Sequence, residues 1–396
     1  MKKLLSLLFS ILLVSSLVFS TVSCNKEESE EEVLDGNVAP ITLTIETETD
    51  DEGNPEKILT EVALSALAKS YVDDNKFEEL NALLKDPKHK DGDAKYLTVN
   101  GDKVTLTIPK VDKIAANSVV NLSFVTNLVV DNAVKEIEKG AFVGLSGLET
   151  ITLPFVGGKV GAVNEAKLFA YIFGTIGTEG LTAVTQNYNI GTESTSSLYV
   201  PTSLKKVIVT GAVTVTEEKV KYYINDDNEH VVLGAEETAP EGKPAYEIDV
   251  ASYKDSAVQP FAFYGITTVE EVVFEGDIDH IPEYTFYGCS AIKVLDFTGS
   301  EITKLGNYAY ANCTSLRKVT FNALAIGEGT FSGCTSLGKA TAIEAGSLDL
   351  TNVTTVGKDA FLGCTSLSKE KVVLGAHSEE ELKDAFNKDF FKADEE

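Results

Sequence analysis

The 396-residue chain has almost no arginine, the residue that binds phosphate and carboxylate groups through two parallel hydrogen bonds. It contains no tryptophan, one methionine and one arginine, Arg317, and its net charge is −27. A single arginine leaves little scope for bidentate phosphate clamps. The negative charge opposes binding to nucleic acids and to anionic membrane surfaces, because both attract basic patches. We therefore expect neither as a direct partner.

Residue patterns of known catalytic and metal sites are also missing. His89, His230, His280 and His377 are scattered without metal-ligand spacing and are interpreted as surface or loop residues. The chain has no Cys-x-x-Cys pair, P-loop, dinucleotide fingerprint or Gly-x-Ser-x-Gly elbow. Residues 226–229, Asp-Asp-Asn-Glu, offer oxygen ligands for calcium but lack EF-hand spacing, so a hairpin turn is the better interpretation. We expect no enzyme activity and no metal or other cofactor.

Residues 1–24 carry an export signal. Two lysines precede an apolar run, Leu4 to Phe19, that is short for a membrane span, and small residues lead to Cys24. The end of this stretch, Thr-Val-Ser-Cys, resembles a bacterial lipobox, which implies that Cys24 is acylated and anchors the chain to a membrane. Thr21 stands where the lipobox usually has leucine. A plain secretory signal cleaved near Ser23 is the alternative.

Residues 25–38 predict an acidic tether. Cys24 is followed by Asn-Lys and then by a run rich in glutamate, a composition typical of disordered segments. A lysine followed by acids resembles the surface-export signal of Bacteroidetes lipoproteins, which implies a location at the outer membrane and cell surface. A solvated tether without an export role is compatible with the same residues.

Residues 39–110 predict a small α+β region that caps the rest of the chain or leads it as a separate domain. Ile41 to Ile45 alternates at strand period. Thr60 to Tyr71 and Phe77 to Leu84 place apolar residues at helical spacing. Tyr96 to Ile108 predicts a hairpin around an Asn-Gly turn.

From residue 111 to 375 one phrase recurs and predicts a repeat fold. Each copy has an aromatic turn, followed in several copies by Cys-Thr-Ser-Leu, and then a short alternating strand. Phe263, Phe286, Tyr310 and Phe331 are 23, 24 and 21 residues apart, which lies in the range of leucine-rich repeats. One unit cannot close a core alone, so stacked units must share one. The structural repeat core is expected at Phe142, Phe263, Phe286, Cys289, Tyr310, Cys313, Phe331, Cys334, Phe361 and Cys364.

The phrase Ala-Phe-x-Gly-Cys-Thr-Ser-Leu, as at Ala360 to Leu367, follows an Ile-x-x-Ile-Gly/Pro element. Together they resemble the BspA-like (Treponema-type) leucine-rich-repeat family. The resemblance covers roughly residues 115–375 and implies a surface-exposed solenoid. Some members of that family bind host matrix proteins or other bacteria, and because ligands differ between members, none is carried over. We expect an α/β solenoid, a leucine-rich-repeat stack with one short parallel strand per repeat.

The four repeat cysteines are interpreted as core residues. Leu145 and Ile266 occupy the same slot in other copies, so the slot is a small buried apolar position, which suits free cysteine. Disulfides and a metal site are the alternatives.

Two stretches interrupt the repeats, and one element is expected to close them. Residues 154–200 resemble an insertion common in this family. Residues 211–258 predict a protruding hairpin, because two apolar stretches flank a polar turn. Within 376–396, a capping box begins at Ser378, and apolar residues at i, i+4 and i+8 predict an amphipathic helix that covers the last repeat: Leu382, Phe386 and Phe390.

Alternation within each repeat strand sends every second side chain outward, and these side chains form a candidate partner-binding face. The face is mixed in sign and much less negative than the chain. Its residues are Thr150, Thr152, Lys206, Ile208, Glu271, Val273, Val294, Asp296, Lys318, Thr320 and Lys339. We expect a monomeric protein that binds a protein or glycan partner in adhesion or cell-cell interaction. A solvated face without a ligand, a structural or antigenic envelope protein and, with less support, a secreted hydrolase are the alternatives.

Overall fold

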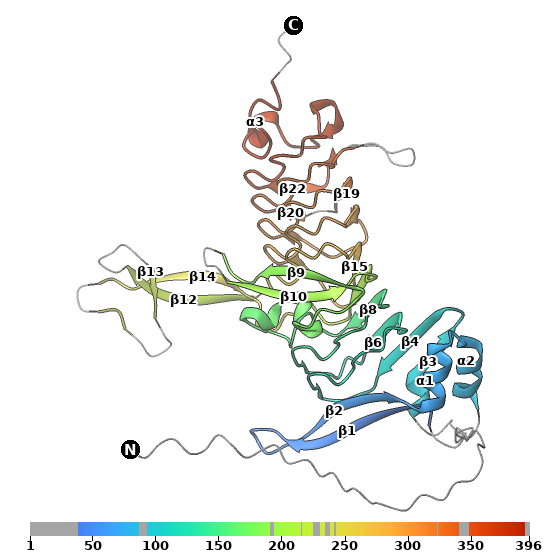
Figure 1. The fold of residues 1–396 in the computed structure, drawn as a ribbon. Coiled ribbons are helices and arrows are strands. Elements are labelled where there is room, and N and C mark those ends of the chain that lie inside the picture. Colours follow the sequence, from blue (N-terminus) through green and yellow to red (C-terminus); the bar gives the residue numbers. More distant parts are fainter. Residues whose placement is uncertain are drawn as a thin grey trace, which may run out of the picture. The chain divides into compact units, whose positions relative to one another are not determined.

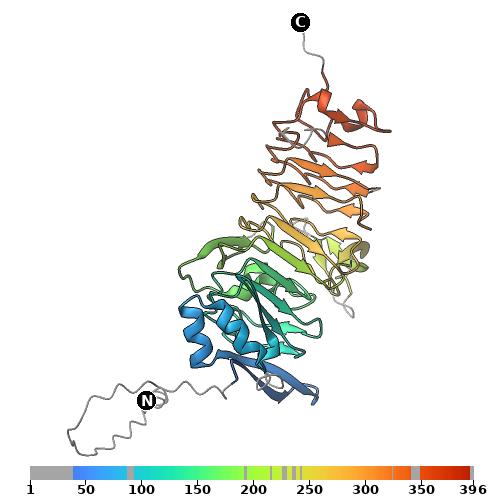
Figure 2. The same cartoon turned by 90° about the vertical axis from the view of Figure 1, so that its right-hand side faces the viewer.

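The structure is a computed structural model. It describes residues 39–86, 93–190, 194–214, 216–224, 230–233, 238–240, 243–322, 324–339 and 348–392. The export signal with Cys24, the tether, His89, the turn at 225–229 and the side chain of His230 lie outside the described part. The described chain is a repeat fold of many short strands and few helices, and Figure 2 shows the coils of the later repeats one above another.

One side of the coils, which we call the strand side, is a parallel sheet. An antiparallel hairpin starts it, and each later strand adds one coil (Figure 1). The strands are β3 (Leu97–Asn100), β4 (Lys103–Ile108), β6 (Asn127–Val130), β8 (Thr150–Leu153), β11 (Lys206–Val209) and β15 (Glu271–Phe274). Later coils place a separate parallel pair here, β17 (Val294–Asp296) and β19 (Lys318–Thr320).

Most coils carry a second short strand, so the expectation of one strand per repeat was wrong. These strands define the back side, where the Ile-x-x-Ile element lies. Two parallel-paired residues suffice there, because the coils above and below complete the ladder, and such short strands give no periodicity to read. In one sheet they are β5 (Lys113–Ile114) and β7 (Glu136–Ile137), which extend the longer antiparallel pair of β1 (Ile41–Thr49) and β2 (Pro55–Leu64). In another sheet they are β16 (His280–Ile281), β18 (Lys304–Leu305), β20 (Leu324–Ile326) and β22 (Val353–Val356).

The third side, the turn side, carries the repeat aromatics, and their rings stack into a column through the core. Ring centroids lie 5.1 Å apart for Phe263 and Phe286 and 5.0 Å apart for Phe286 and Tyr310. Cys289, Cys313, Cys334 and Cys364 are free and buried. Each thiol contacts the backbone of an earlier coil, as Cys334 Sγ does at 3.2 Å from the carbonyl oxygen of Tyr310.

Residues 154–200 form part of the stack itself. The description of this stretch as an insertion is therefore incomplete. The 3-10 helices η3 (Asn164–Lys167) and η4 (Phe169–Phe173) precede a hairpin of β9 (Leu181–Asn187) and β10 (Thr195–Pro201). Phe173 and Phe169 continue the aromatic column between Phe142 and Phe263. The stretch therefore supplies core to the repeats on both sides of it.

The described residues of 211–258 form three strands, so the predicted single hairpin was too simple. β12 (Thr216–Ile224) pairs antiparallel with β13 (His230–Val232) on one edge and with β14 (Tyr246–Ser252) on the other (Figure 1). The sequence of β14, Tyr-Glu-Ile-Asp-Val, alternates apolar and charged residues at strand period and so contains the missed signal.

The N-terminal region pairs with the repeats on two sides: β2 is parallel to β5, and β4 is parallel to β6. Its helices are α1 (Ala66–Asp73) and α2 (Phe77–Lys85), followed by the 3-10 turn η2 (Asp93–Tyr96). The helix predicted from Thr60 is wrong up to Leu64, because these residues continue β2 and pair with β1.

The C-terminal segment ends the aromatic column, but not as one amphipathic helix. After β21 (Leu348–Asp349), η5 (Lys369–Lys371) and β23 (Val372–Val373), helix α3 covers only Glu379–Leu382, where the capping box is present. The carbonyl oxygens of Asp384 and Ala385 accept hydrogen bonds from Asp359 N and Phe361 N, both at 2.7 Å. Because the preceding coil uses these carbonyls, the helix cannot continue through them.

Candidate binding face

Two rows of outward side chains lie in register across five strands of the strand side. Residues that alternate with them are buried in β4, β6, β8 and β11. We call the ten outward residues the strand face. The first row is Thr105, Asn127, Thr150, Lys206 and Glu271, and the second row is Thr107, Val129, Thr152, Ile208 and Val273.

The strand face is almost uncharged. Lys206 and Glu271 are its two charged residues, and they form an ion pair with 3.0 Å between Nζ and Oε1. The second row consists of β-branched residues, whose side chains have few rotamers and so lose little entropy when they are covered. In a chain with a net charge of −27, this surface is close to neutral.

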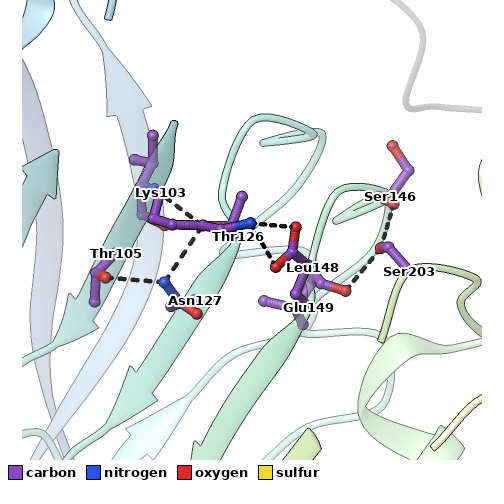
Figure 3. Close-up of polar contacts among 9 residues, drawn as sticks. Lys103, Thr105, Thr126, Asn127, Ser146, Leu148, Glu149 and Ser203 are labelled. Carbon is purple, nitrogen blue, oxygen red and sulfur yellow. Dashed lines mark hydrogen bonds and ion pairs between the residues drawn. The ribbon is translucent and has the colours of Figure 1, made fainter. Parts of the chain in front are cut away.

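Ion pairs line the edge of the face where the strands begin. Lys103 Nζ lies 2.7 Å from Glu149 Oε1 (Figure 3), and Glu270 lies between Lys205 at 3.7 Å and Lys293 at 2.8 Å. The hydrogen bond from Lys293 holds the pKa of the Glu270 carboxyl below its ordinary value. Exposed pairs of this kind contribute little to stability, but they cancel most of the charge along the edge.

Hydrogen bonds between neighbouring coils hold the starts of the strands (Figure 3). Thr126 Oγ1 accepts a hydrogen bond from Val104 N at 2.9 Å and donates one to Val104 O at 3.1 Å. Asn127 Nδ2 donates to Thr105 Oγ1 at 3.3 Å. Ser203 Oγ lies 2.7 Å from the carbonyl oxygen of Leu148. These contacts fix the register on which the two rows depend.

The structure brings together six of the eleven residues that the sequence placed on one face, and it separates the rest. Val294, Asp296, Lys318 and Thr320 lie on β17 and β19, in register with each other but in a different sheet. Lys339 lies outside every described strand, in a turn where its amide donates to Ser336. Sequence reasoning missed four members, although their alternation was visible: Thr105, Thr107, Asn127 and Val129.

His280 is buried in β16, so the expectation of a surface histidine was wrong. Its ring lies edge-on to Tyr253 with 6.1 Å between centroids, and its exposed fraction is 8 %. Burial lowers the pKa of His280 to about 4, and the charge of Lys304 contributes in the same direction. His377 is half-buried, with Nε2 2.9 Å from the carbonyl oxygen of Val353.

The described residues offer no arrangement for metal chemistry. Nowhere among them do three or more His, Cys, Asp or Glu side chains gather as a metal-binding group. Burial raises the pKa of the Cys289 thiol and disfavours its reactive thiolate form. Within the same residues, no helix has the length and apolar character needed to cross a membrane.

Comparison with protein families identifies the repeats. The family model described as the BspA type leucine-rich repeat region matches in six copies, over residues 100–165 and 253–368. No curated protein matches the chain.

Three solved structures are similar to the chain at low sequence identity. A leucine-rich-repeat protein of Treponema pallidum is 12% identical, with 84% of this chain and 97% of that chain covered and a TM-score of 0.31. One from Bacteroides ovatus is 18% identical, with 67% and 59% covered and a TM-score of 0.26. A leucine-rich cell surface protein of Faecalibacterium prausnitzii is 15% identical, with 69% and 51% covered and a TM-score of 0.23.

Proposed function

Since its repeats belong to the BspA-type leucine-rich-repeat family, we propose that this chain is an exported, lipid-anchored bacterial surface protein that binds a protein or glycan partner through the strand face. Binding, and not catalysis, is its activity. The observation that carries the proposal is the near-neutral surface of ten in-register side chains on a chain of net charge −27.

The physical argument is that this face loses little when a partner covers it. Its second row carries no charge to desolvate, and its first row holds one lysine that is already paired with a glutamate. Elsewhere, the acidic surface repels polyanions and other copies of the chain. A flat row of β-branched side chains suits a broad contact with a protein or glycan surface.

The lipobox-like sequence that ends at Cys24 and the acidic segment 25–38 support the location. Protease shaving of intact cells tests it. We expect peptides from 211–258 and from the repeats to be released while the cells stay sealed. Release only after lysis would place the protein inside the envelope and contradict adhesion.

A panel of host matrix proteins and glycans, with binding measured on the purified chain, tests the face. We expect one class to bind saturably and Ile208→Glu to weaken that binding at least tenfold, because the charge interrupts the second row. Val163→Glu is the matched control, since Val163 is 68% exposed and lies outside the face. Equal binding by both variants, or no saturable ligand at all, would favour a structural envelope protein.

A further inference from the structure

The strand side is interrupted between β15 and β17. β15 pairs with β11, and β17 pairs with β19, but no ladder joins β15 to β17 in the described structure. A cleft of about 1000 Å³ opens at this position, and its lining reaches the core rings of Phe286 and Tyr310.

Inward side chains beside this cleft are less buried than their counterparts in other coils. Val272, Phe274 and Leu295 are half-buried. Ile151 and Val207 hold the corresponding positions of β8 and β11 and are fully buried. The opening is therefore a local separation of two coils, and its walls are core residues.

The turn side explains the separation, because its aromatic column has one ring more than the strands require. Between Phe142 and Phe263, helix η4 contributes two rings, Phe173 and Phe169, where a single coil would contribute one. The column therefore has five ring-to-ring steps, with 6.5, 5.5, 4.9, 5.1 and 5.0 Å between successive ring centroids. Its rings are, in order, Phe142, Phe173, Phe169, Phe263, Phe286 and Tyr310.

The back side also climbs five steps between the same coils. Backbone hydrogen bonds to carbonyl oxygens join one layer to the next. Ile137 N donates to Gly158 O at 2.7 Å and Val156 N to Ala257 O at 2.8 Å. Ala257 N in turn donates to Ala212 O at 2.8 Å. Val213 N then donates to Asp277 at 2.8 Å, and β16 pairs with β18. The additional layer is the segment around Ala257, where the chain returns from β14.

The strand side covers the same height in four steps, from β6 through β8, β11 and β15 to β17. Layers of paired strands are about 4.8 Å apart, so this side is one strand short. The shortage falls where the ladder is broken. We propose that this vacancy accepts one extended strand of a partner polypeptide.

Both neighbouring strands turn backbone groups toward the vacancy. Glu271 N and Glu275 N donate to carbonyls of the β11 segment at 3.1 and 2.8 Å, so by alternation Val272 and Phe274 face the other way. Phe297 N donates to Thr320 at 2.9 Å, which leaves the amides of Val294 and Asp296 on the cleft side. An added strand would find partners along both of its edges.

The lining selects the chemistry of that strand. Its inward side chains would meet Val272, Leu295 and the core rings and must be apolar. Its outward side chains would lie between Asp296 and Glu271, the latter paired with Lys206. The lining has more carboxylates than cations, so lysine or arginine is favoured; the charged residues are Glu270, Glu271, Asp277, Asp296 and Glu301 against Lys293 and Arg317. The acidic tether 25–38 of the chain itself has the wrong charge. The occupant is therefore a basic segment with alternating apolar residues, supplied by another polypeptide.

The first probe is a labelled synthetic peptide with the sequence of residues 203–210, Ser-Leu-Lys-Lys-Val-Ile-Val-Thr, because this strand already pairs with β15 on its other edge. Fluorescence anisotropy should show saturable binding to the purified chain. A peptide with both lysines replaced by glutamate should bind at least tenfold more weakly. Absence of saturable binding by the basic peptide would overturn the proposal.

The matched protein variant is Val294→Pro, which removes an amide facing the cleft and leaves the amides of Leu295 and Phe297 that face β19. We expect this variant to bind the peptide at least tenfold more weakly than the original chain does. Val294→Thr keeps the amide and should bind the peptide as tightly as the original chain. Unchanged binding by Val294→Pro would contradict strand addition.

Hydrogen exchange on the unmodified chain gives a readout that does not depend on the variant folding. Bound peptide should slow exchange at Val272, Phe274, Val294 and Asp296, and uniform or absent protection would count against the proposal. The vacancy and the strand face can bind independently of each other, so failure of this test leaves the proposed function open to its own test.

Discussion

At the scale of single residues, His280 links the fold to pH. It is 8 % exposed, and its Nε2 atom has no hydrogen-bond partner among the described residues. Burial lowers its pKa to about 4. The neutral ring suits this site, whereas the protonated ring would be a buried charge without compensation.

We predict that His280→Leu removes an acid-sensitive part of the stability. The unfolded chain binds the proton with a pKa of about 6.5 and the folded chain with a pKa of about 4. The contribution of the neutral His280 ring to the free energy of unfolding is therefore fully present above about pH 6.5 and is lost as the pH falls toward 4. Between about pH 7.5 and about pH 5, urea unfolding should show the original chain losing about 2 kcal/mol more than the variant. Equal losses would contradict a buried neutral histidine.

At the scale of elements, the turns that carry the repeat aromatics have a left-handed backbone at a residue other than glycine in four described coils, at Phe261, Tyr284, Tyr308 and Asp359. Tyr284 and Tyr308 both have a φ of 55°, at a position where Gly140 and Gly329 stand in other coils with φ of 73° and 58°. Tyr284 stacks between Phe261 at 4.9 Å and Tyr308 at 5.1 Å. Ring stacking therefore offsets backbone strain in these turns.

Two substitutions at Tyr284 separate the effect of ring stacking from the effect of backbone strain. Tyr284→Ala and Tyr284→Gly remove the same ring contacts, but only glycine relieves the left-handed backbone. We expect both to destabilise the chain and the glycine variant to be the more stable by about 1 kcal/mol. This order is the reverse of that in ordinary helices and strands. Urea unfolding checks it, and an alanine variant at least as stable as the glycine variant would refute the role of strain.

How much of the fold the sequence predicts depends on the length of each element. Strands such as β6 and β8 alternate over four residues, and the aromatic period is regular, so the repeats and the family follow from the sequence. Two-residue strands on the back side give no periodicity. Thr60 to Leu64 fits both helical and strand spacing, and pairing with β1 decides it.

The candidate site is less predictable than the fold. Outward residues within one strand follow from alternation, and this places Thr150, Lys206 and Glu271 in one row. Whether successive strands join depends on how the interruptions thread through the stack. The break between β15 and β17 arises from η4 and from the segment around Ala257, which follows β14. The sequence of β15 itself does not predict either of these features.

At the scale of the whole molecule, each coil contacts only its neighbours, so stability is a sum along the stack and its ends are the weakest points. Phe386 closes the column at one end, with its ring 4.9 Å from Phe361 and 4.5 Å from Phe390. Its exposed fraction is 3 %.

We predict that Phe386→Ala loosens the last coils and leaves the early ones intact. Truncation of a buried phenylalanine costs about 3–5 kcal/mol, and here the cost falls on one end of the stack. Hydrogen exchange should show faster exchange at β22 and Phe361 with unchanged protection at β6, β8 and β11. Leu362→Ala is the control, because Leu362 is 40 % exposed. A uniform loss of protection would mean that the chain unfolds as a single cooperative unit.

The unequal number of layers on the three sides has a counterpart in crystals, where an extra half-plane of atoms ends in an edge dislocation. Such a defect cannot be removed by rearranging the atoms around it, since only adding or deleting a layer restores the lattice. By the same reasoning, repacking side chains beside β15 can change what fits between the coils but cannot close them. Closure requires deleting η4 together with the return segment after β14, or adding a strand.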